Sequence, residues 1–293
     1  PPAPTSPRAA PTADTPRPQA GELGAARDEA MAGSVVLAVL AAPASALCVL
    51  RDATVCWGNE RRYVERTNFF DIINILRDSS PALGDVDGDG DLDLVVGEFY
   101  GGLNYYENVG SASSPDYAPV TGTANPFDGL DVDGYSTPAF GDVDGDGDLD
   151  LVVGEFDGGL NYYENVGNAS SPDYAPVTGT ANPFDDIDVG EQRSKPAFAD
   201  LDGDGDLDLV VGEYGGVLNY YENVGSPASP RYEAVTGTAN PFDGRASSSV
   251  TMFSAPALAD LDGDGDLDLV VGEQDGVLDY YENVGSAASP SYA

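Results

Sequence analysis

Asp85-Val-Asp-Gly-Asp-Gly-Asp-Leu-Asp93 is a run of alternating aspartates that decides the fold of this 293-residue chain. The same pattern starts again at Asp142, Asp200 and Asp260, so successive copies are spaced by 57, 58 and 60 residues. A fixed period of this length is typical of repeat proteins, in which each repeat is one supersecondary unit that packs on its neighbours. The sequence therefore predicts an array of four similar units.

The spacing of the carboxylates in each run is typical of a site for Ca²⁺, a cation that accepts about six to eight oxygen ligands in flexible geometry. Positions 1, 3, 5 and 9 offer carboxylates, position 7 offers its backbone carbonyl, and the glycine at position 6 permits the sharp turn that gathers them. Without a cation, carboxylates this close would repel one another strongly. We therefore expect about four Ca²⁺ ions, one in each loop. The expected metal-binding residues are Asp85, Asp87, Asp89, Asp91, Asp93, Asp142, Asp144, Asp146, Asp148, Asp150, Asp200, Asp202, Asp204, Asp206, Asp208, Asp260, Asp262, Asp264, Asp266 and Asp268.

The residues around the loop exclude an EF-hand. An EF-hand needs a bidentate glutamate at position 12, and the first copy has Val96 there, inside the apolar run Leu94–Val96. Pro81 precedes the loop and a short β-branched strand follows it, so nothing helical flanks it. A solvated acidic turn without a metal is the other alternative, and the fourfold recurrence of the spacing favours the metal site.

Four short strands are expected in each repeat, as the second copy illustrates. Pro138–Phe140 leads into the aspartate loop, and Asp150–Glu155 is a strand with a nearly continuous apolar core. Asp157–Gly159 is a hairpin turn, followed by the alternating strand Leu160–Val166. Asp173–Thr178 carries a proline, which is typical of an edge strand. Four such strands in about 58 residues make one blade of a β-propeller.

The alternating strand of each repeat carries a pair of tyrosines. In the second copy, Leu160, Tyr162 and Val166 are expected to share one face of the sheet. We expect the tyrosines to pack in the core and between repeats, and sugar stacking is the alternative. The pairs are Tyr105-Tyr106, Tyr162-Tyr163, Tyr220-Tyr221 and Tyr280-Tyr281.

The stretch Phe140-Gly-Asp-Val-Asp-Gly-Asp-Gly-Asp-Leu-Asp-Leu-Val-Val-Gly154 resembles the FG-GAP/VCBS repeat. That repeat builds the calcium-bearing β-propeller of integrin α subunits and of many secreted or cell-surface proteins, and the resemblance covers roughly residues 68–293. It implies an all-β fold of β-propeller blades, with four FG-GAP-like repeats of four short antiparallel strands each. The propeller would be either closed and four-bladed or an incomplete arc of a larger one. The "GAP" element reads Gly-Glu here, as in Gly154-Glu155.

The region before the repeats has three parts. Residues 1–30 are rich in proline and alanine and are expected to be disordered, or untranslated if Met31 is the true start. Residues 31–46 form a short apolar stretch that ends in an Ala-x-Ala pattern, which predicts a signal peptide; a membrane anchor or an ordinary helix are the alternatives. Residues 47–67 are a pre-repeat segment. The predicted blades cover about 68–124, 125–181, 182–239 and 240–293, the last of them incomplete.

A signal peptide would place the protein outside the cell, whereas an anchor would tether it to the membrane with the repeats outside. Cys48 and Cys56 could then pair across a small loop, although two cysteines cannot form a disulfide scaffold. Asn168-Ala-Ser170 is a glycosylation sequon in an expected loop.

Charge is divided sharply along the chain, whose formal net charge is −39. Residues 1–67 hold seven arginines and seven acidic residues, so the whole net charge lies on the repeats. Such a surface disfavours nucleic acid and anionic membranes as partners.

Signals of catalysis are absent from the sequence. The chain has no histidine, which excludes Ser-His-Asp and Cys-His catalysis and histidine-ligated zinc. Glycosidase chemistry needs only two carboxylates, but a catalytic pair should be unique, and most acidic residues here recur in every repeat. We therefore expect no enzyme, but a module for adhesion or ligand binding whose partner is an extracellular protein or glycan. The alternative is a non-catalytic appendage of a larger extracellular enzyme.

One segment of each repeat varies while the rest is repeated. From the asparagine of the Asn-Pro-Phe-Asp-like corner to the proline before the aspartate loop, the separations are 13, 13, 14 and 16 residues. Variation of this kind maps to loops on one face, often the binding face, and neutral drift is the alternative. These loops hold most of the basic residues of the repeats, and Phe253 is expected to add exposed apolar contact. The candidate ligand-binding residues are Arg193, Lys195, Arg245 and Phe253.

Overall fold

The computed structural model describes residues 48–49, 55–56, 70, 73–75, 77–190, 193–245 and 253–293. All of them belong to the unit Ala32–Ala293. The predicted disordered segment and the predicted signal peptide lie outside the described residues. Within them the protein is all β, with four antiparallel sheets of three or four strands, one two-stranded pair and three single-turn 3₁₀ helices, so the predicted fold class is confirmed. No helix among the described residues is long and apolar enough to span a membrane.

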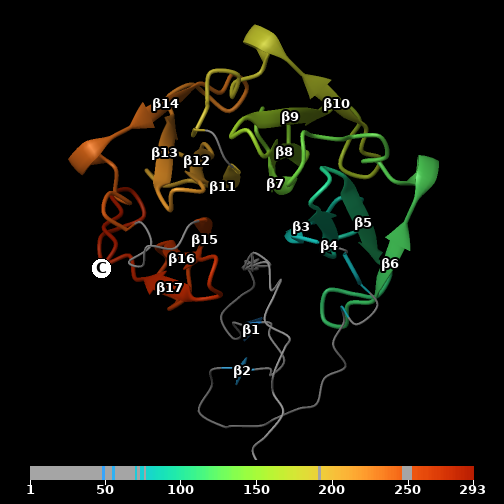
Figure 1. Cartoon of the computed structure of the whole chain (residues 1–293), viewed down its shortest axis with the longest axis horizontal. Helices are drawn as coiled ribbons and strands as arrows, with labels where there is room; N and C mark the ends of the chain where they lie inside the picture. The colour runs from blue at the N-terminus through green and yellow to red at the C-terminus, as the bar shows by residue number, and fades with distance from the viewer. Residues whose placement is uncertain are drawn as a thin grey trace, which may run out of the picture. The chain divides into compact units, whose positions relative to one another are not determined.

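Each sheet is one blade of a propeller, and its strands follow one another in chain order (Figure 1). Blade 1 contains β3 (Ser80–Gly84), β4 (Asp93–Gly97), β5 (Leu103–Asn108) and β6 (Tyr117–Val120); blade 2 contains β7 (Thr137–Gly141), β8 (Asp150–Gly154), β9 (Leu160–Asn165) and β10 (Tyr174–Val177). Blade 3 contains β11 (Lys195–Ala199), β12 (Asp208–Gly212), β13 (Leu218–Asn223) and β14 (Tyr232–Val235); blade 4 contains β15 (Ala255–Ala259), β16 (Asp268–Gly272) and β17 (Leu278–Tyr281). The 3₁₀ helices Gly122–Ala124, Gly179–Ala181 and Gly237–Ala239 follow the outermost strands of blades 1, 2 and 3. A separate short pair, β1 (Cys48–Val49) and β2 (Val55–Cys56), places Cys48 opposite Cys56.

The second strand of each blade is the most buried. In blade 2, every residue of β8 is buried, because β7 and β9 flank it and the neighbouring blades cover its two faces. This explains why the strand is a continuous apolar run rather than an alternating one. The prediction for Val166 is wrong: Leu160 and Tyr162 are buried, but Val166 is 54% exposed because β9 ends at Asn165.

A phenylalanine from the Asn-Pro-Phe-Asp corner joins consecutive blades. Phe127, at the start of blade 2, is 1% exposed. Its ring lies edge-on to Tyr105 of blade 1, at 5.5 Å between centroids, and stacks on Tyr174 of its own blade at 4.8 Å. Phe184 and Phe242 are also 1% exposed and make the same pair of contacts one and two blades later. The same aromatic trio therefore fills each joint.

A buried serine forms hydrogen bonds across the same contact between blades, nearer the innermost strands. The Oγ of Ser194 accepts a hydrogen bond from the backbone N–H of Glu155 and donates one to the carbonyl of Gly159, at 3.0 and 2.7 Å. Ser136 and Ser254 make equivalent bonds at the other two joints. A Cβ at Gly154 would overlap the carbonyl oxygen of Ser194, which explains the glycine of the repeated Gly-Glu pair.

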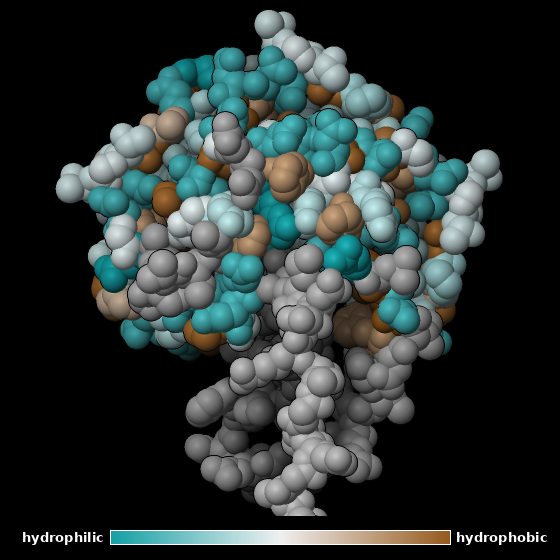
Figure 2. Space-filling model, viewed as in Figure 1, coloured by the Kyte–Doolittle hydropathy of each residue, from teal (hydrophilic) through white to brown (hydrophobic). Residues whose placement is uncertain are grey.

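The innermost strands β3, β7, β11 and β15 contact one another in succession around the propeller ring (Figure 1). The face in view in Figure 2 is mainly hydrophilic, with apolar residues scattered over it. The loops that precede these innermost strands include the segments that vary in length between blades. They are therefore the part of the scaffold in which one blade can differ from another.

Candidate metal centre

The aspartate loop connects the first two strands of each blade and is held by its own side chains. In blade 1, the Oδ2 of Asp85 accepts a hydrogen bond from the N–H of Gly90 at 3.0 Å, and the Oδ1 of Asp89 accepts one from Asp91 at 2.9 Å. Gly90 has a φ of 93°, a conformation that glycine adopts without strain. The corresponding bonds recur in the other three loops, so the sequence motif folds the same way four times.

Three carboxylates meet in every loop. One oxygen from each of positions 1, 3 and 5 lies within 4.8 Å of the others, which is close enough for all three to contact one cation. In blades 1 and 2, the Oδ1 atoms of Asp85 and Asp142 are buried without a hydrogen-bond partner among the described residues. A clustered set of hard oxygens with an unsatisfied buried acceptor fits Ca²⁺. The groups are Asp85, Asp87 and Asp89; Asp142, Asp144 and Asp146; Asp200, Asp202 and Asp204; and Asp260, Asp262 and Asp264.

The aspartate at position 9 lies outside these groups. Asp93 is 1% exposed, and its two oxygens accept hydrogen bonds from the N–H of Val86, the hydroxyl of Tyr105 and the N–H of Asn108. A carboxylate offers about four lone-pair sites, so one remains for a metal. The ligand role predicted for Asp93, and the carbonyl role predicted for Asp91, stay predictions. In this structure Asp93 links the aspartate loop to β5, the third strand of the blade, by hydrogen bonds.

Burial also changes how these carboxylates titrate. Desolvation raises the pKa of Asp150 and of Asp208 to about 6, although the hydrogen bonds that they accept act in the opposite direction. Desolvation likewise raises the pKa of Asp87, to which the charges of Asp89 and Asp85 add. These shifts describe the metal-free loop, in which the ionised forms have no cation to stabilise them.

The stability of the metal-free protein and that of the calcium-loaded protein are therefore expected to change with pH in opposite directions. A carboxyl whose folded pKa is raised from 3.8 to about 6 favours folding below pH 4, and that contribution is lost as the pH rises through 6. In EDTA, raising the pH from 4.5 to 7.5 should cost about 1–3 kcal/mol of unfolding free energy for each of Asp150 and Asp208. With calcium, stability should rise over the same range, because protons compete with the cation. Urea denaturation at both pH values measures the change in unfolding free energy. A change of the same sign in EDTA and in calcium would contradict the prediction.

A second cluster lies just before the innermost strands, where the residue preceding a serine is left-handed in every blade; that serine is buried in blades 2, 3 and 4. These residues have φ values of 47° (Asp78), 53° (Tyr135), 54° (Arg193) and 74° (Phe253). In the described chain they are the only non-glycine residues with positive φ. Such a conformation is uncommon for bulky side chains and is often found at binding sites. We name these four residues the axial cluster.

Arg193 is the centre of the axial cluster. Its guanidinium lies 3.5 Å from the ring centroid of Tyr135 and 4.4 Å from that of Phe253, so two blades hold it between aromatic faces. Lys195 lies deeper, and its burial, together with the charge of Arg193, lowers its pKa to about 7. Asp78, Tyr135, Arg193 and Lys195 line a cavity of about 10 Å³.

The structure thus brings together three of the four residues predicted to bind a ligand. Arg193 lines the small cavity with Lys195 and lies over the ring of Phe253, whereas Arg245 lies apart, with its guanidinium 5.7 Å from the ring of Tyr281. Phe253 is not exposed as expected: it is 7% exposed, because it packs on Tyr214 and under Arg193. Sequence reasoning missed Asp78 and Tyr135. The serine that follows each of the four positions was the available signal.

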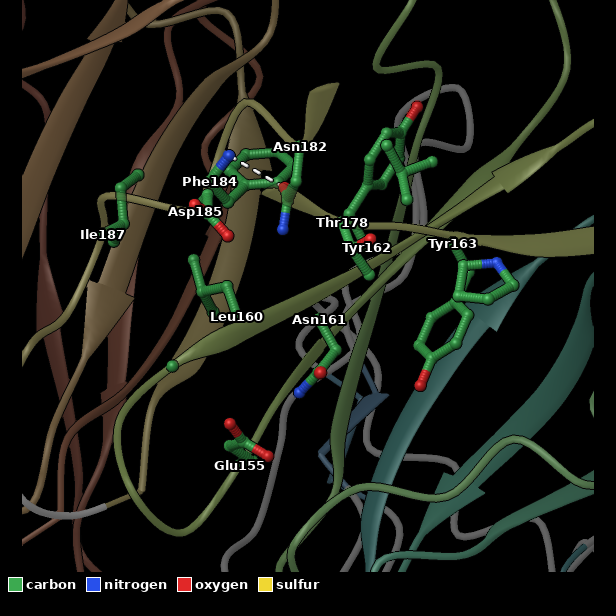
Figure 3. Close-up of a pocket in the computed structure, with 13 residues that line it drawn as sticks. Glu155, Leu160, Asn161, Tyr162, Tyr163, Thr178, Asn182, Phe184, Asp185 and Ile187 are labelled. Carbon is green, nitrogen blue, oxygen red and sulfur yellow. Dashed lines mark hydrogen bonds between the residues drawn. The ribbon is translucent and has the colours of Figure 1, made fainter. Parts of the chain in front are cut away.

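A larger cavity, of about 210 Å³, lies between blades 2 and 3 (Figure 3). It is lined by Glu155, Asn161, Asn182 and Asp185, beside the ring of Tyr163. The Nδ2 of Asn161 is buried there without a hydrogen-bond partner among the described residues. Blades 1 and 3 repeat the glutamate and the first asparagine, so we regard this cavity as part of the blade joint rather than as a site specific to one blade.

Comparison with known proteins identifies the family of the repeats. Curated proteins give no match. One solved structure, of an Agrocybe aegerita lectin that recognises non-reducing terminal N-acetylglucosamine, has a TM-score of 0.40 and 20% identity, covering 75% of this chain and 52% of the lectin. The family model for the FG-GAP-like repeat matches residues 85–153, 142–211 and 200–271, which together span more than half of the sequence. The chain therefore belongs to the FG-GAP-like repeat family.

Proposed function

We propose that the protein is a secreted or cell-surface module that binds a protein or glycan at the axial cluster, on a propeller that Ca²⁺ stabilises. Four clusters of carboxylates support the metal, and calcium sites with a Kd of about 10⁻⁴–10⁻³ M are typical of extracellular modules. The repeats support a binding role, because the segments that vary between them map to loops on one face, which is often the binding face.

The axial cluster is the observation that carries this proposal. The blades repeat their strands, metal loops and joints almost residue for residue, yet the four left-handed positions carry four chemically different side chains. Each such conformation costs about 1–3 kcal/mol and persists only where the surrounding structure imposes it. A repeated scaffold that keeps a strained backbone while varying its side chain is best explained by selection for binding.

The chemistry of the cluster favours a ligand with an acidic or hydroxyl-rich group. Arg193 offers a guanidinium that is already held between two aromatic rings, so little side-chain entropy is lost when it binds. Asp78 adds an acceptor, and Tyr135, whose ring packs against Arg193 and Phe156, adds its hydroxyl. Elsewhere the surface is strongly acidic, and it would repel an acidic ligand that did not reach this cation.

Replacing Arg193 by alanine is expected to lower the affinity for the ligand at least tenfold, because this removes the guanidinium that lies between the rings of Tyr135 and Phe253. The measurement is binding of the full chain, in calcium, to an array of glycans and to cell-surface extracts, followed by titration of the best ligand. Arg231→Ala is the matched control, since Arg231 is exposed and pairs with Glu233 on an outer strand. Equal loss of binding in both variants, or none in either, would place the ligand elsewhere, and the cavity of Figure 3 would be tested next with Asn182→Ala.

A further inference from the structure

The turn between the third and fourth strands of blade 2 carries the triplet Asn168-Ala-Ser170, which is an acceptor sequence for N-linked glycosylation. No other asparagine of the chain is followed two positions later by serine or threonine. Asn168 and Ser170 are both exposed in the structure. The side-chain amide and the hydroxyl of the triplet therefore lie at the surface of the folded blade.

The fold of this turn does not require an asparagine. In each blade the first residue of the turn accepts a hydrogen bond of 2.8–2.9 Å from the N–H of the serine three positions later. In the other blades that first residue is a serine, namely Ser111, Ser226 and Ser286. In blade 2 the Oδ1 of Asn168 also accepts a hydrogen bond from the N–H of Ser170 at 3.2 Å. Asn168 is thus a departure from the repeat at a position where serine forms the same turn.

The turn lies at the end of the blade that bears the aspartate loop. Because the strands are antiparallel and follow one another in chain order, the β7–β8 and β9–β10 connections lie at one end, and the residues before β7 lie at the other. The N–H of Ala169 donates a hydrogen bond to the Oδ1 of Asp148 in the aspartate loop, at 2.7 Å. A sugar on Asn168 would therefore project from the end of the blade opposite to the axial cluster.

We propose that Asn168 carries an N-linked oligosaccharide, added as the chain passes through a secretory compartment. This inference rests on the proposed export of the protein. The sugar donor is an oligosaccharide linked to a lipid through a diphosphate. The Nδ2 of Asn168 forms a bond to the anomeric carbon of the donor, the bond from that carbon to the diphosphate breaks, the diphosphate leaves with the lipid, and Nδ2 gives up a proton. An exposed turn accepts such a bulky group without displacing packed side chains.

Expression of the full chain in a eukaryotic secretory host tests the proposal. One form keeps its own N-terminal sequence, and a second form follows an established secretion signal. We expect one glycan on each chain of the second form, seen as a shift in electrophoretic mobility when peptide N-glycosidase F removes the sugar. Mass spectrometry should find Asn168 converted to aspartate by that enzyme. Asn168→Gln and Ser170→Ala should each abolish the shift, and Ser170→Thr should retain it.

The equivalent turns of blades 1 and 3 provide matched variants. Ser111→Asn completes the acceptor triplet in blade 1 and should add a second glycan, whereas Ser226→Asn precedes Pro227 and should add none.

Two outcomes separate this proposal from the proposed export. Protein of the second form that is recovered from the medium without a sugar on Asn168 overturns the acceptor site and leaves the proposed function standing. A sugar on the second form but not on the first supports the acceptor site and contradicts export by the chain's own N-terminal sequence.

Discussion

Removing calcium is expected to lower the melting temperature of this protein by about 20 °C or more. At a free concentration of about 100 times Kd, each bound ion adds roughly 2.7 kcal/mol to the folded state, and four loops act on one set of packed blades. The cause is electrostatic, because three carboxylates within 4.8 Å of one another repel when no cation lies between them. Thermal melts in calcium and in EDTA give the shift, and titration calorimetry should count about four ions.

A single-site variant separates calcium binding from a general effect of charge. Asp144→Asn should remove one ion from the count and part of the stabilisation. Asp157→Asn removes the same charge from an exposed hairpin turn and should change neither quantity. Absence of calcium uptake, or melting that EDTA does not affect, would refute the metal site.

Replacing Phe184 by alanine is expected to cost about 3–5 kcal/mol of unfolding free energy. The ring is 1% exposed and fills the joint between blades 2 and 3, where it contacts Tyr162 at 5.6 Å and Tyr232 at 4.8 Å between ring centroids. Because stability in repeat arrays is the sum of repeat and interface terms, weakening one interface should also reduce cooperativity. Urea denaturation should then show a broadened or two-step transition.

Phe156→Ala provides the comparison for this result. Phe156 is 38% exposed and lies in a hairpin turn, so its removal leaves no buried cavity. We expect a loss of less than about 1 kcal/mol and a single transition. Equal losses in the two variants would mean that the joint is not where the blades gain their stability.

Much of this fold could be predicted from the sequence, because the signals are local. The aspartate loop needs a glycine at one position and carboxylates at alternate positions, and both are visible in the stretch that starts at Asp85. The strand Asp150–Gly154 was predicted from its apolar run, and the hairpin that follows it from Asp157–Gly159. The fourfold recurrence of these signals identified the blade.

What the sequence could not show depends on contacts between blades. Phe127 was recognised as part of a repeated corner, but its position between two tyrosines of different blades is set by packing. Phe253 was expected at the surface because it lies in a variable loop, and a left-handed turn directs it under Arg193 instead. Asp93 looks like any other aspartate of its run, yet it is buried and accepts hydrogen bonds from Tyr105 and Asn108, both on β5.

The sameness of the three joints has a consequence for how such a chain can evolve. Phe127, Phe184 and Phe242 occupy equivalent sites, so any blade can follow any other without a compensating change in the core. Unequal recombination between copies this similar would add or delete a whole blade, together with its metal loop and its axial residue. The number of blades and the identity of the axial residues can therefore change in single genetic steps. Each added blade already carries the side chains that pack it against its neighbours.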